Sequence, residues 1–219
     1  MSNVVRKLLV NKPYVEIGGV KWATMNIGAN TETDYGLYFQ WGDKNGYTSG
    51  QVGSDSAEYK KPFAWADYKF GNGTSNLNNE ASALTKYNGT DGKTVLDETD
   101  DAAVANWGGN WRMPTREVFV ALGNAVNTAW TTNYNDSGVN GLVCTDKTDN
   151  SKKLFFPAAS YCKDGIVNGV GSYGDYWSSS RAPSDAPSAH IFNFASSIVN
   201  WQISYARYYG FSIRPVLAV

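Results

Sequence analysis

Residues 190–204 read HIFNFASSIVNWQIS, and their pattern decides the fold class. Apolar and polar side chains alternate here at a period of two. A β-strand points successive side chains to opposite faces, so this period is typical of a sheet with one buried and one open face. The same alternation recurs at Phe211 and Ile213. Together the two stretches predict buried side chains at Phe192, Phe194, Val199, Trp201, Phe211 and Ile213. It predicts exposed side chains at Asn193, Asn200, Gln202 and Ser204, and it places Ile203 on the side of Trp201.

Short strands are also expected earlier in the chain. Residues 14–27 read as a hairpin around Gly18-Gly19. Residues 44–83 are rich in Gly, Ser, Asn and Lys, and their scattered aromatic residues are expected to hold this long insertion against the body of the protein. The other strand candidates are residues 36–41, 142–143, 154–156 and 176–177.

Two helices are expected between these strands. Thr99 is a candidate N-cap for the first, with Asp100 and Asp101 in its first turn, where carboxylates favour the positive end of the helix dipole. Thr115 is the candidate N-cap of the second. Its apolar stripe is Val118, Phe119, Leu122 and Val126, and Trp111 and Arg112 at its entry are interpreted as scaffold residues. Because no repeat and no βαβ order occurs, one α+β domain over residues 1–219 is predicted, with a mixed or antiparallel sheet.

The composition narrows the class of partner. The 219 residues carry a formal net charge of −1, with 42% hydrophobic and 18% charged residues, which is typical of a folded globular protein. A nucleic-acid partner normally meets a basic patch, so none is expected. No apolar run approaches the ~18 residues of a membrane span, so no membrane insertion is expected. The run Leu8–Val10 is too short for a secretory signal peptide, although a signal already removed stays an alternative.

An enzyme needs a set of reactive side chains, and the sequence offers none at the usual spacings. His190 is the only histidine, which argues against a catalytic triad or a zinc site. The glycine pattern at 169–174 spells GxGxxG, but the residues after it do not read as a helix, so we interpret it as a turn. Cys144 and Cys162 could form a disulfide or stay as separate thiols. No catalytic residue, metal or cofactor is therefore expected.

Several motifs then occur together and in order. They are KWATMNIG at 21–28, YGLYFQWGD at 35–43, DDAA at 100–103, WGGNWRMPT at 107–115, FFPAA at 155–159, YWSSS at 176–180 and GFSIRPV at 210–216. With these motifs nearly the whole chain resembles the Fibrobacter succinogenes major paralogous domain family. The WRMPT segment at 111–115 and the GFSIR segment at 210–214 are also similar to the formylglycine-generating-enzyme branch of the C-type lectin fold. The resemblance implies a C-type lectin-like fold with two helices, a twisted sheet and adjacent termini.

The C-terminal motifs carry a narrower resemblance, to the variable proteins of diversity-generating retroelements. In those systems an error-prone reverse transcriptase rewrites adenines in the last part of the gene. The resemblance implies a scaffold over residues 1–176 and a variable ligand-binding region over residues 177–216. The implied ligand-binding residues are Arg181, Ser184, Asp185, Ser188, His190, Ile191, Asn193, Ala195, Ile198, Asn200, Gln202, Ser204 and Tyr205. Ordinary surface variety is the alternative interpretation of these positions.

The function implied is ligand binding without catalysis. By analogy with the family, the partner would be a protein or glycan on a cell surface, and the chain would be displayed on a phage or prophage virion or on a bacterial surface. A non-diversified adhesin or surface-structural module of the same family is the first alternative. An oxidase of the formylglycine-generating type is the second, but no cysteine follows Cys162, whereas those enzymes use a cysteine pair near the C-terminal end of the fold. The calcium-binding motifs of sugar-binding C-type lectins are also missing from the sequence.

Overall fold

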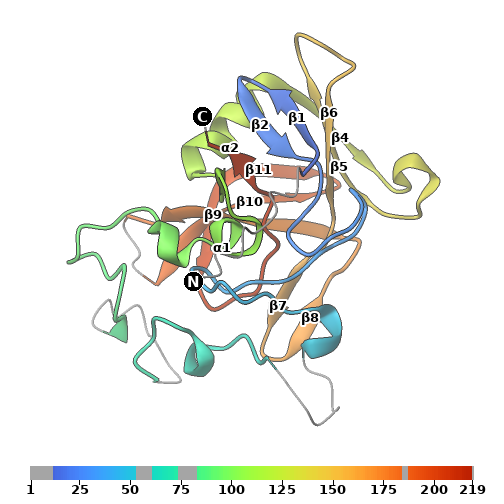
Figure 1. Cartoon of the computed structure of the whole chain (residues 1–219). Coiled ribbons are helices and arrows are strands. Elements are labelled where there is room, and N and C mark those ends of the chain that lie inside the picture. Colours follow the sequence, from blue (N-terminus) through green and yellow to red (C-terminus); the bar gives the residue numbers. More distant parts are fainter. Residues whose placement is uncertain (1–11, 53–60, 74–82, 184–186, 219) are drawn as a thin grey trace, which may run out of the picture.

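The computed structural model describes residues 12–52, 61–73, 83–183 and 187–218. It confirms a mixed α+β structure, with helices and several antiparallel sheets (Figure 1). The helices are α1 (Ala102–Trp107) and α2 (Arg116–Ala125). The strands are β1 (Tyr14–Ile17), β2 (Val20–Ala23), β3 (Trp111–Arg112), β4 (Val126–Thr131), β5 (Gly141–Asp146), β6 (Lys153–Pro157), β7 (Tyr161–Lys163), β8 (Ile166–Asn168), β9 (Tyr173–Arg181), β10 (Ser188–Ala195), β11 (Ile198–Ala206) and β12 (Val216–Leu217).

One sheet joins the two ends of the described chain. Its strand order is β1-β2-β12-β3, so the C-terminal strand lies between the N-terminal hairpin and β3. Val216 of β12 pairs with Trp22 on one side and with Arg112 on the other. The predicted hairpin at residues 14–27 is confirmed, since β1 and β2 pair around the Gly18-Gly19 turn. The last described strand therefore forms its hydrogen bonds with the second strand of the N-terminal hairpin and with β3.

The sheet β11-β10-β9 crosses the middle of the molecule (Figure 1). Helix α2 packs on one side of it, where Phe119 of the helix meets Phe192 with ring centroids 5.4 Å apart. On the other side Trp177 and Ile191 belong to a second buried cluster, in which Trp177 contacts Phe211 at 4.5 Å. Strands β9 and β10 are thus covered on both faces for much of their length. The buried positions predicted at Phe192, Phe194, Phe211 and Ile213 are confirmed.

Of the two predicted helix caps, one is confirmed and one is wrong. Thr115 caps α2 as predicted, and its hydroxyl accepts a hydrogen bond from the Val118 amide at 3.4 Å. Thr99 does not cap α1, because it lies in a 3₁₀ turn at Glu98–Asp100. The cap is Asp101, whose carboxylate accepts from the amides of Ala103 and Val104. Asp101 also accepts from the Met113 amide at 2.9 Å, so one side chain satisfies three backbone donors.

Two other expectations need correction. Residues 36–41 form no strand, although Tyr38 and Phe39 form isolated bridges to Tyr47 and Phe211. Val126 does not extend the apolar stripe of the second helix but begins β4, whose pairing with β5 was not predicted. The strand segments expected at 142–143, 154–156 and 176–177 are confirmed within β5, β6 and β9.

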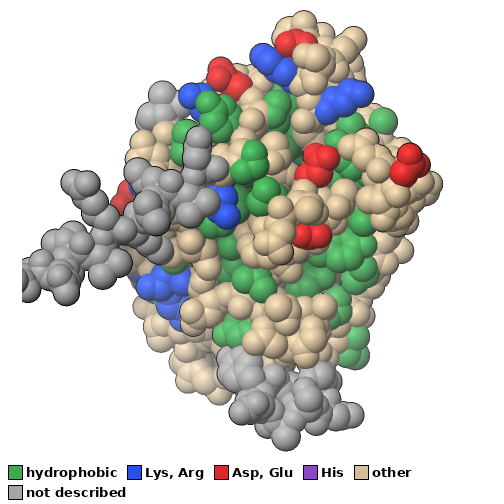
Figure 2. All heavy atoms as spheres, turned by 45° about the vertical axis from the view of Figure 1, so that its right-hand side comes forward, with side chains coloured by type: hydrophobic (Ala, Val, Ile, Leu, Met, Phe, Trp, Pro, Cys, Tyr) green, Lys and Arg blue, Asp and Glu red, His purple; other side chains and the backbone are tan. Residues whose placement is uncertain are grey.

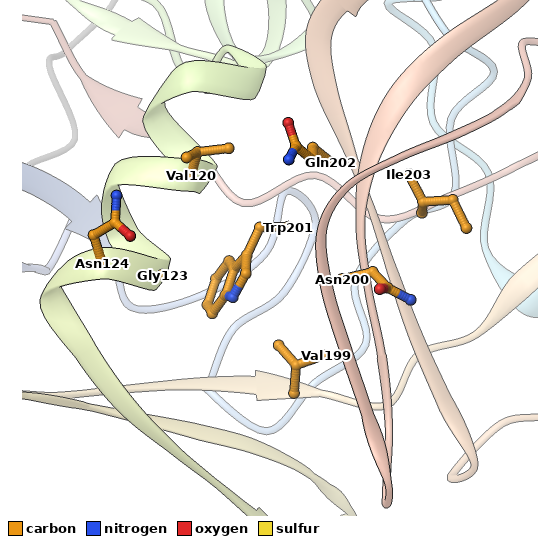
Figure 3. Close-up of a pocket in the computed structure, with 8 residues that line it drawn as sticks. All are labelled: Val120, Gly123, Asn124, Val199, Asn200, Trp201, Gln202 and Ile203. Carbon is orange, nitrogen blue, oxygen red and sulfur yellow. The ribbon is translucent and has the colours of Figure 1, made fainter.

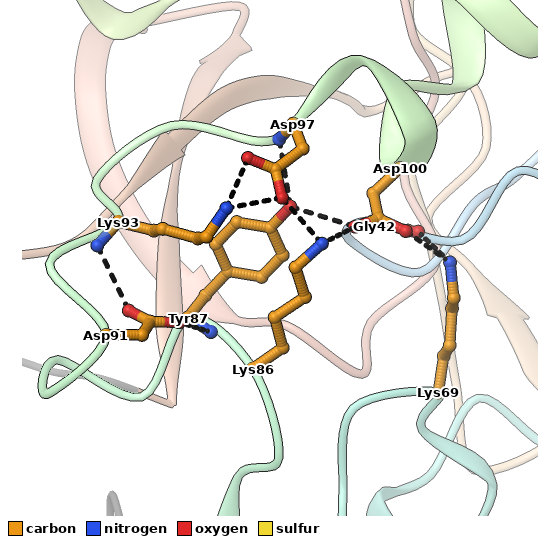
Figure 4. A network of polar contacts seen from close by, with 8 residues as sticks. All are labelled: Gly42, Lys69, Lys86, Tyr87, Asp91, Lys93, Asp97 and Asp100. Atoms are coloured by element: carbon orange, nitrogen blue, oxygen red, sulfur yellow. Dashed lines mark hydrogen bonds and ion pairs between the residues drawn. The ribbon is translucent and has the colours of Figure 1, made fainter.

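The described part of the long insertion is held against the body as predicted. Phe63, Tyr68 and Phe70 are buried. A polar network adds to this packing (Figure 4): Lys69 and Lys86 both contact the Asp100 carboxylate, and the Tyr87 hydroxyl donates to it at 2.9 Å. The question left open for the cysteines is also answered, since Cys144 and Cys162 are separate buried thiols.

Candidate ligand-binding face

Strand β11 lies at the edge of the central sheet and carries most of its exposed side chains. Ile198 is 51% exposed, Ile203 38% and Tyr205 37%, which is unusual for large apolar side chains. The predicted exposure of Asn200, Gln202 and Ser204 is confirmed, but Asn193 is half-buried and not exposed as predicted. Figure 2 shows a face of the molecule on which hydrophobic side chains gather between scattered charged ones.

A β-bulge in the middle of β11 interrupts the alternation on which the register was predicted. Asn193 pairs with Asn200, but Ile191 pairs with Ile203, so Phe192 alone lies opposite both Trp201 and Gln202. Paired residues of an antiparallel sheet point to the same face. Beyond the bulge, therefore, Ile203 and Tyr205 point to the face of Asn193 and Asn200, and Ser204 points to the opposite face. The prediction that Ile203 shares the side of Trp201 is wrong for this reason.

One face of β11 looks toward α2. Trp201 stacks on Phe192 with ring centroids 4.4 Å apart and planes at 5°, and it also lies against Gly123 of the helix. Val199 and Trp201 are half-buried rather than fully buried as predicted, because they border a hollow of about 530 Å³ between β11 and α2. In Figure 3 the Trp201 and Val199 side chains lie on the helix side of the strand, whereas Asn200 and Ile203 lie on its other side.

His190 belongs to the α2 face as well. Its Nδ1 lies 3.2 Å from both the Ser204 hydroxyl and the Gln202 carbonyl oxygen. Burial lowers the pKa of His190, which favours the neutral imidazole. The ring borders a second hollow of about 320 Å³, together with Arg116 and Glu117 at the start of α2. His190 and Ser204 are therefore separated by the sheet from the exposed residues of the other face.

The opposite face holds a row of three polar residues across three strands. Asp175 of β9 pairs with Asn193 of β10, which pairs with Asn200 of β11. The Asn193 side-chain amide donates to the Asp175 carboxylate at 2.7 Å. Asp175 is only 3% exposed, and its burial raises the pKa of the carboxyl group to about 6 although the hydrogen bond lowers it.

Tyrosine side chains surround this row. Tyr173 lies two residues before Asp175 on the same face and is 47% exposed. The ring centroids of Tyr205 and Tyr209 are 5.7 Å apart, and those of Tyr209 and Tyr161 are also 5.7 Å apart. Burial raises the pKa of Tyr205, and the nearby Asp175 and other tyrosines raise it further. We define the Asp175 face as Tyr173, Asp175, Asn193, Asn200, Ile203 and Tyr205.

The predicted ligand-binding residues divide between these environments. Asn193, Ala195, Ile198, Asn200 and Tyr205 share one face of the sheet, with Asn193 and Ala195 half-buried. Gln202 is exposed within the bulge, and Ser204 is exposed on the α2 face. Ser184 and Asp185 lie outside the described residues.

Four of the predicted binding residues are buried, and this corrects their expected exposure. They are Arg181, Ser188, His190 and Ile191, each at most 8% exposed. Ile191 packs in the core with Trp177 because the sheet is covered on both faces at this level. The Arg181 guanidinium group donates to the backbone carbonyls of Lys93 and Ala182, so it fixes a loop.

Three residues of the Asp175 face were absent from the predicted set. Tyr173 and Asp175 stand four and two residues before Trp177, so continuing the period-two pattern backward from Trp177 could have found them. No comparable signal existed for Ile203, because a single sequence does not show where a bulge falls.

The chemistry of the remaining reactive groups is limited. Among the described residues, no three His, Cys, Asp or Glu side chains gather where they could hold a metal ion. Burial raises the pKa of both the Cys144 and the Cys162 thiol, which disfavours the reactive thiolate. In the described part of the chain, neither helix has the length and apolar character that crossing a membrane requires. Comparison with protein-family models, with curated proteins and with solved structures found no match to this chain.

Proposed function

We propose that this chain is a non-enzymatic ligand-binding protein of C-type lectin-like fold, and that it binds through the open part of β10 and β11. Two helices, antiparallel sheets and the pairing of β12 with β2 and β3 agree with that fold. The partner proposed is a protein or glycan on a cell surface. The chain itself would be displayed on a phage or prophage virion or on a bacterial surface.

The observation that carries this proposal is the contrast between neighbouring strands. Phe192 and Phe194 of β10 are fully buried, while the adjacent β11 exposes Ile198, Asn200, Ile203 and Tyr205. The exposed side chains differ in size and polarity, yet the backbone that carries them is fixed by a core on both sides of β10. Such an arrangement suits recognition, because exposed substitutions usually change stability little.

We further propose that the C-terminal part of the chain, residues 177–216, is diversified by a retroelement. The scaffold would be residues 1–176 and the variable region residues 177–216. Within that region we now restrict the proposed contacts to Asn193, Ala195, Ile198, Asn200, Gln202, Ser204 and Tyr205, and we add Ile203 and, from the scaffold, Tyr173 and Asp175. Arg181, Ser188, His190 and Ile191 are left out because they are buried.

The gene neighbourhood tests the diversification directly. The proposal expects a reverse-transcriptase gene nearby and a near-copy of the codons for residues 177–216 that differs only at adenines. A neighbourhood with neither feature would contradict diversification and favour a constant adhesin or surface-structural module. Copper binding together with oxidation of a cysteine peptide would instead favour an oxidase.

A further inference from the structure

The Asp175 carboxylate lacks a counter-charge although it is almost completely covered. Among the described residues it accepts one hydrogen bond, from Asn193, and it forms no ion pair. A buried carboxylate is normally paired with a cation or held by several donors, because leaving water costs free energy. Asp175 therefore sits in an environment that a cation from outside would improve.

The groups around Asp175 would also favour a cation. Tyr173 and Tyr205 expose parts of their side chains on the same face, and Tyr161 and Tyr209 lie beside Tyr205. The negative face of an aromatic ring attracts ammonium and guanidinium groups. The protein already uses this contact nearby, where the Lys163 ammonium group lies 5.5 Å from the centre of the Tyr209 ring.

We propose that the Asp175 face recognises a cationic group of its ligand, an alkylammonium or a guanidinium, which sits against the Asp175 carboxylate beside Tyr173 and Tyr205. The inference rests on the proposed function, since it specifies what chemistry that face binds. Asn193 would hold the carboxylate in place, and the exposed Asn200 amide and Ile203 side chain would contact the part of the ligand next to the cation. An anionic group would be repelled at this position, and a neutral sugar would leave the carboxylate uncompensated.

Protonation of Asp175 should weaken such binding. Two titratable side chains, Tyr176 and Tyr205, lie near enough for the Asp175 charge to raise their pKa. Tyr161, Tyr173 and Tyr209 lie around Tyr205, and the Lys163 ammonium group lies against Tyr209. His190 lies on the opposite face of the sheet. Because the pKa of Asp175 is about 6, the carboxylate is mostly ionised at about pH 7.5 and about nine-tenths protonated at about pH 5. The affinity for a cation should therefore fall about tenfold between these two values.

The test is a titration of the full chain followed by NMR at the Asn193 and Asn200 side-chain amides. N-acetyl-arginine amide is compared with its neutral isostere N-acetyl-citrulline amide, and glucosamine with N-acetylglucosamine. We expect at least one charged probe to bind about tenfold more tightly than its neutral partner at about pH 7.5. A preference for the arginine probe would indicate a polypeptide cation, and a preference for glucosamine an amino sugar.

Two variants make the test specific. Asp175→Asn keeps the shape and an acceptor for Asn193, and it should abolish the preference for the charged probe. Asp136→Asn removes the same charge from an exposed turn between β4 and β5 and should leave the preference unchanged. Equal affinity of the charged and neutral probes, or an unchanged preference in Asp175→Asn, would overturn the cation site while leaving ligand binding by this face intact. Absence of any shift with all four probes would overturn it as well.

Discussion

Gly123 lies inside helix α2, directly against the indole ring of Trp201. A Cβ atom at this position would stand 2.7 Å from the ring atoms, which is closer than carbon atoms pack. In an exposed helix the change from glycine to alanine normally stabilises by about 0.5–1 kcal/mol. Here the same change must displace Trp201 and disturb its stacking on Phe192.

We therefore predict that Gly123→Ala destabilises the protein by about 1–3 kcal/mol, as is usual for overpacking. Urea denaturation measures the free energy of unfolding. In a Trp201→Ala background the same substitution should be neutral or stabilising, because the ring is gone. A stabilising effect of Gly123→Ala in the wild-type background would show that Trp201 does not pack against the helix.

Asp175 makes a second prediction at this scale. Burial raises its pKa to about 6, so the folded state disfavours the charged form more than the unfolded state does. When the carboxyl pKa is higher in the folded state than in the unfolded state, stability is lost as the pH rises from the unfolded-state pKa toward the folded-state pKa. Asp175→Asn removes this loss. Between pH 4 and pH 7 the free energy of unfolding should therefore fall by roughly 2 kcal/mol less in the variant than in wild type. Chemical denaturation of both proteins across this range is the measurement, and parallel pH profiles would contradict the assigned burial.

At the scale of elements, the sequence predicted β10 better than β11. The alternation through Phe192 and Phe194 is unbroken, and both side chains are buried as predicted. In β11 the register changes at Trp201 and Gln202, because two residues there face one residue of β10. The sequence carries no turn residue or glycine at that point, so the bulge depends on tertiary packing against α2. The alternation counted backward from Trp177 places Asp175 on the face of that buried side chain, but it does not show that Asn193 of the next strand lies opposite.

The insertion depends on a polar anchor as well as on its buried rings. Burial raises the pKa of Asp100, but hydrogen bonds from Lys69, Lys86 and Tyr87 outweigh that effect and lower it. A lowered carboxyl pKa contributes stability at neutral pH that is lost as the pH falls through the folded value. Asp100 therefore couples the insertion to the region that precedes α1 (Figure 4).

We predict that Asp100→Asn destabilises the protein by roughly 1–3 kcal/mol, since it removes the buried charge that Lys69 and Lys86 share and leaves Lys86 with Asp97 alone. Limited proteolysis should cut the insertion faster in this variant. The control is Asp149→Asn, because the Asp149 side chain is 44% exposed and the Lys152 ammonium group is 3.9 Å from its carboxylate. Equal cleavage rates for Asp100→Asn and the control would mean that the network does not hold the insertion.

At the scale of the molecule, the buried interior is shared by residues far apart in the chain. β12 pairs with β2 and β3, and Phe211 packs on Trp177 and bridges to Phe39. The C-terminal part of the chain therefore supplies both core residues and exposed ones. A mechanism that changed every residue of this part would destroy the fold, whereas changes confined to the open face would preserve it.

Two matched libraries of the full chain test this division most directly. The first randomises Ile198, Asn200, Gln202, Ser204 and Tyr205, and the second randomises Arg181, Ser188, His190, Ile191 and Phe192. Each is scored for soluble expression and for the midpoint of thermal unfolding. We predict that most members of the first library fold with nearly wild-type midpoints, because exposed substitutions usually cost within about ±0.5 kcal/mol each, and that most members of the second do not fold. Equal losses in both libraries would contradict the claim that β11 presents a replaceable face on a fixed core.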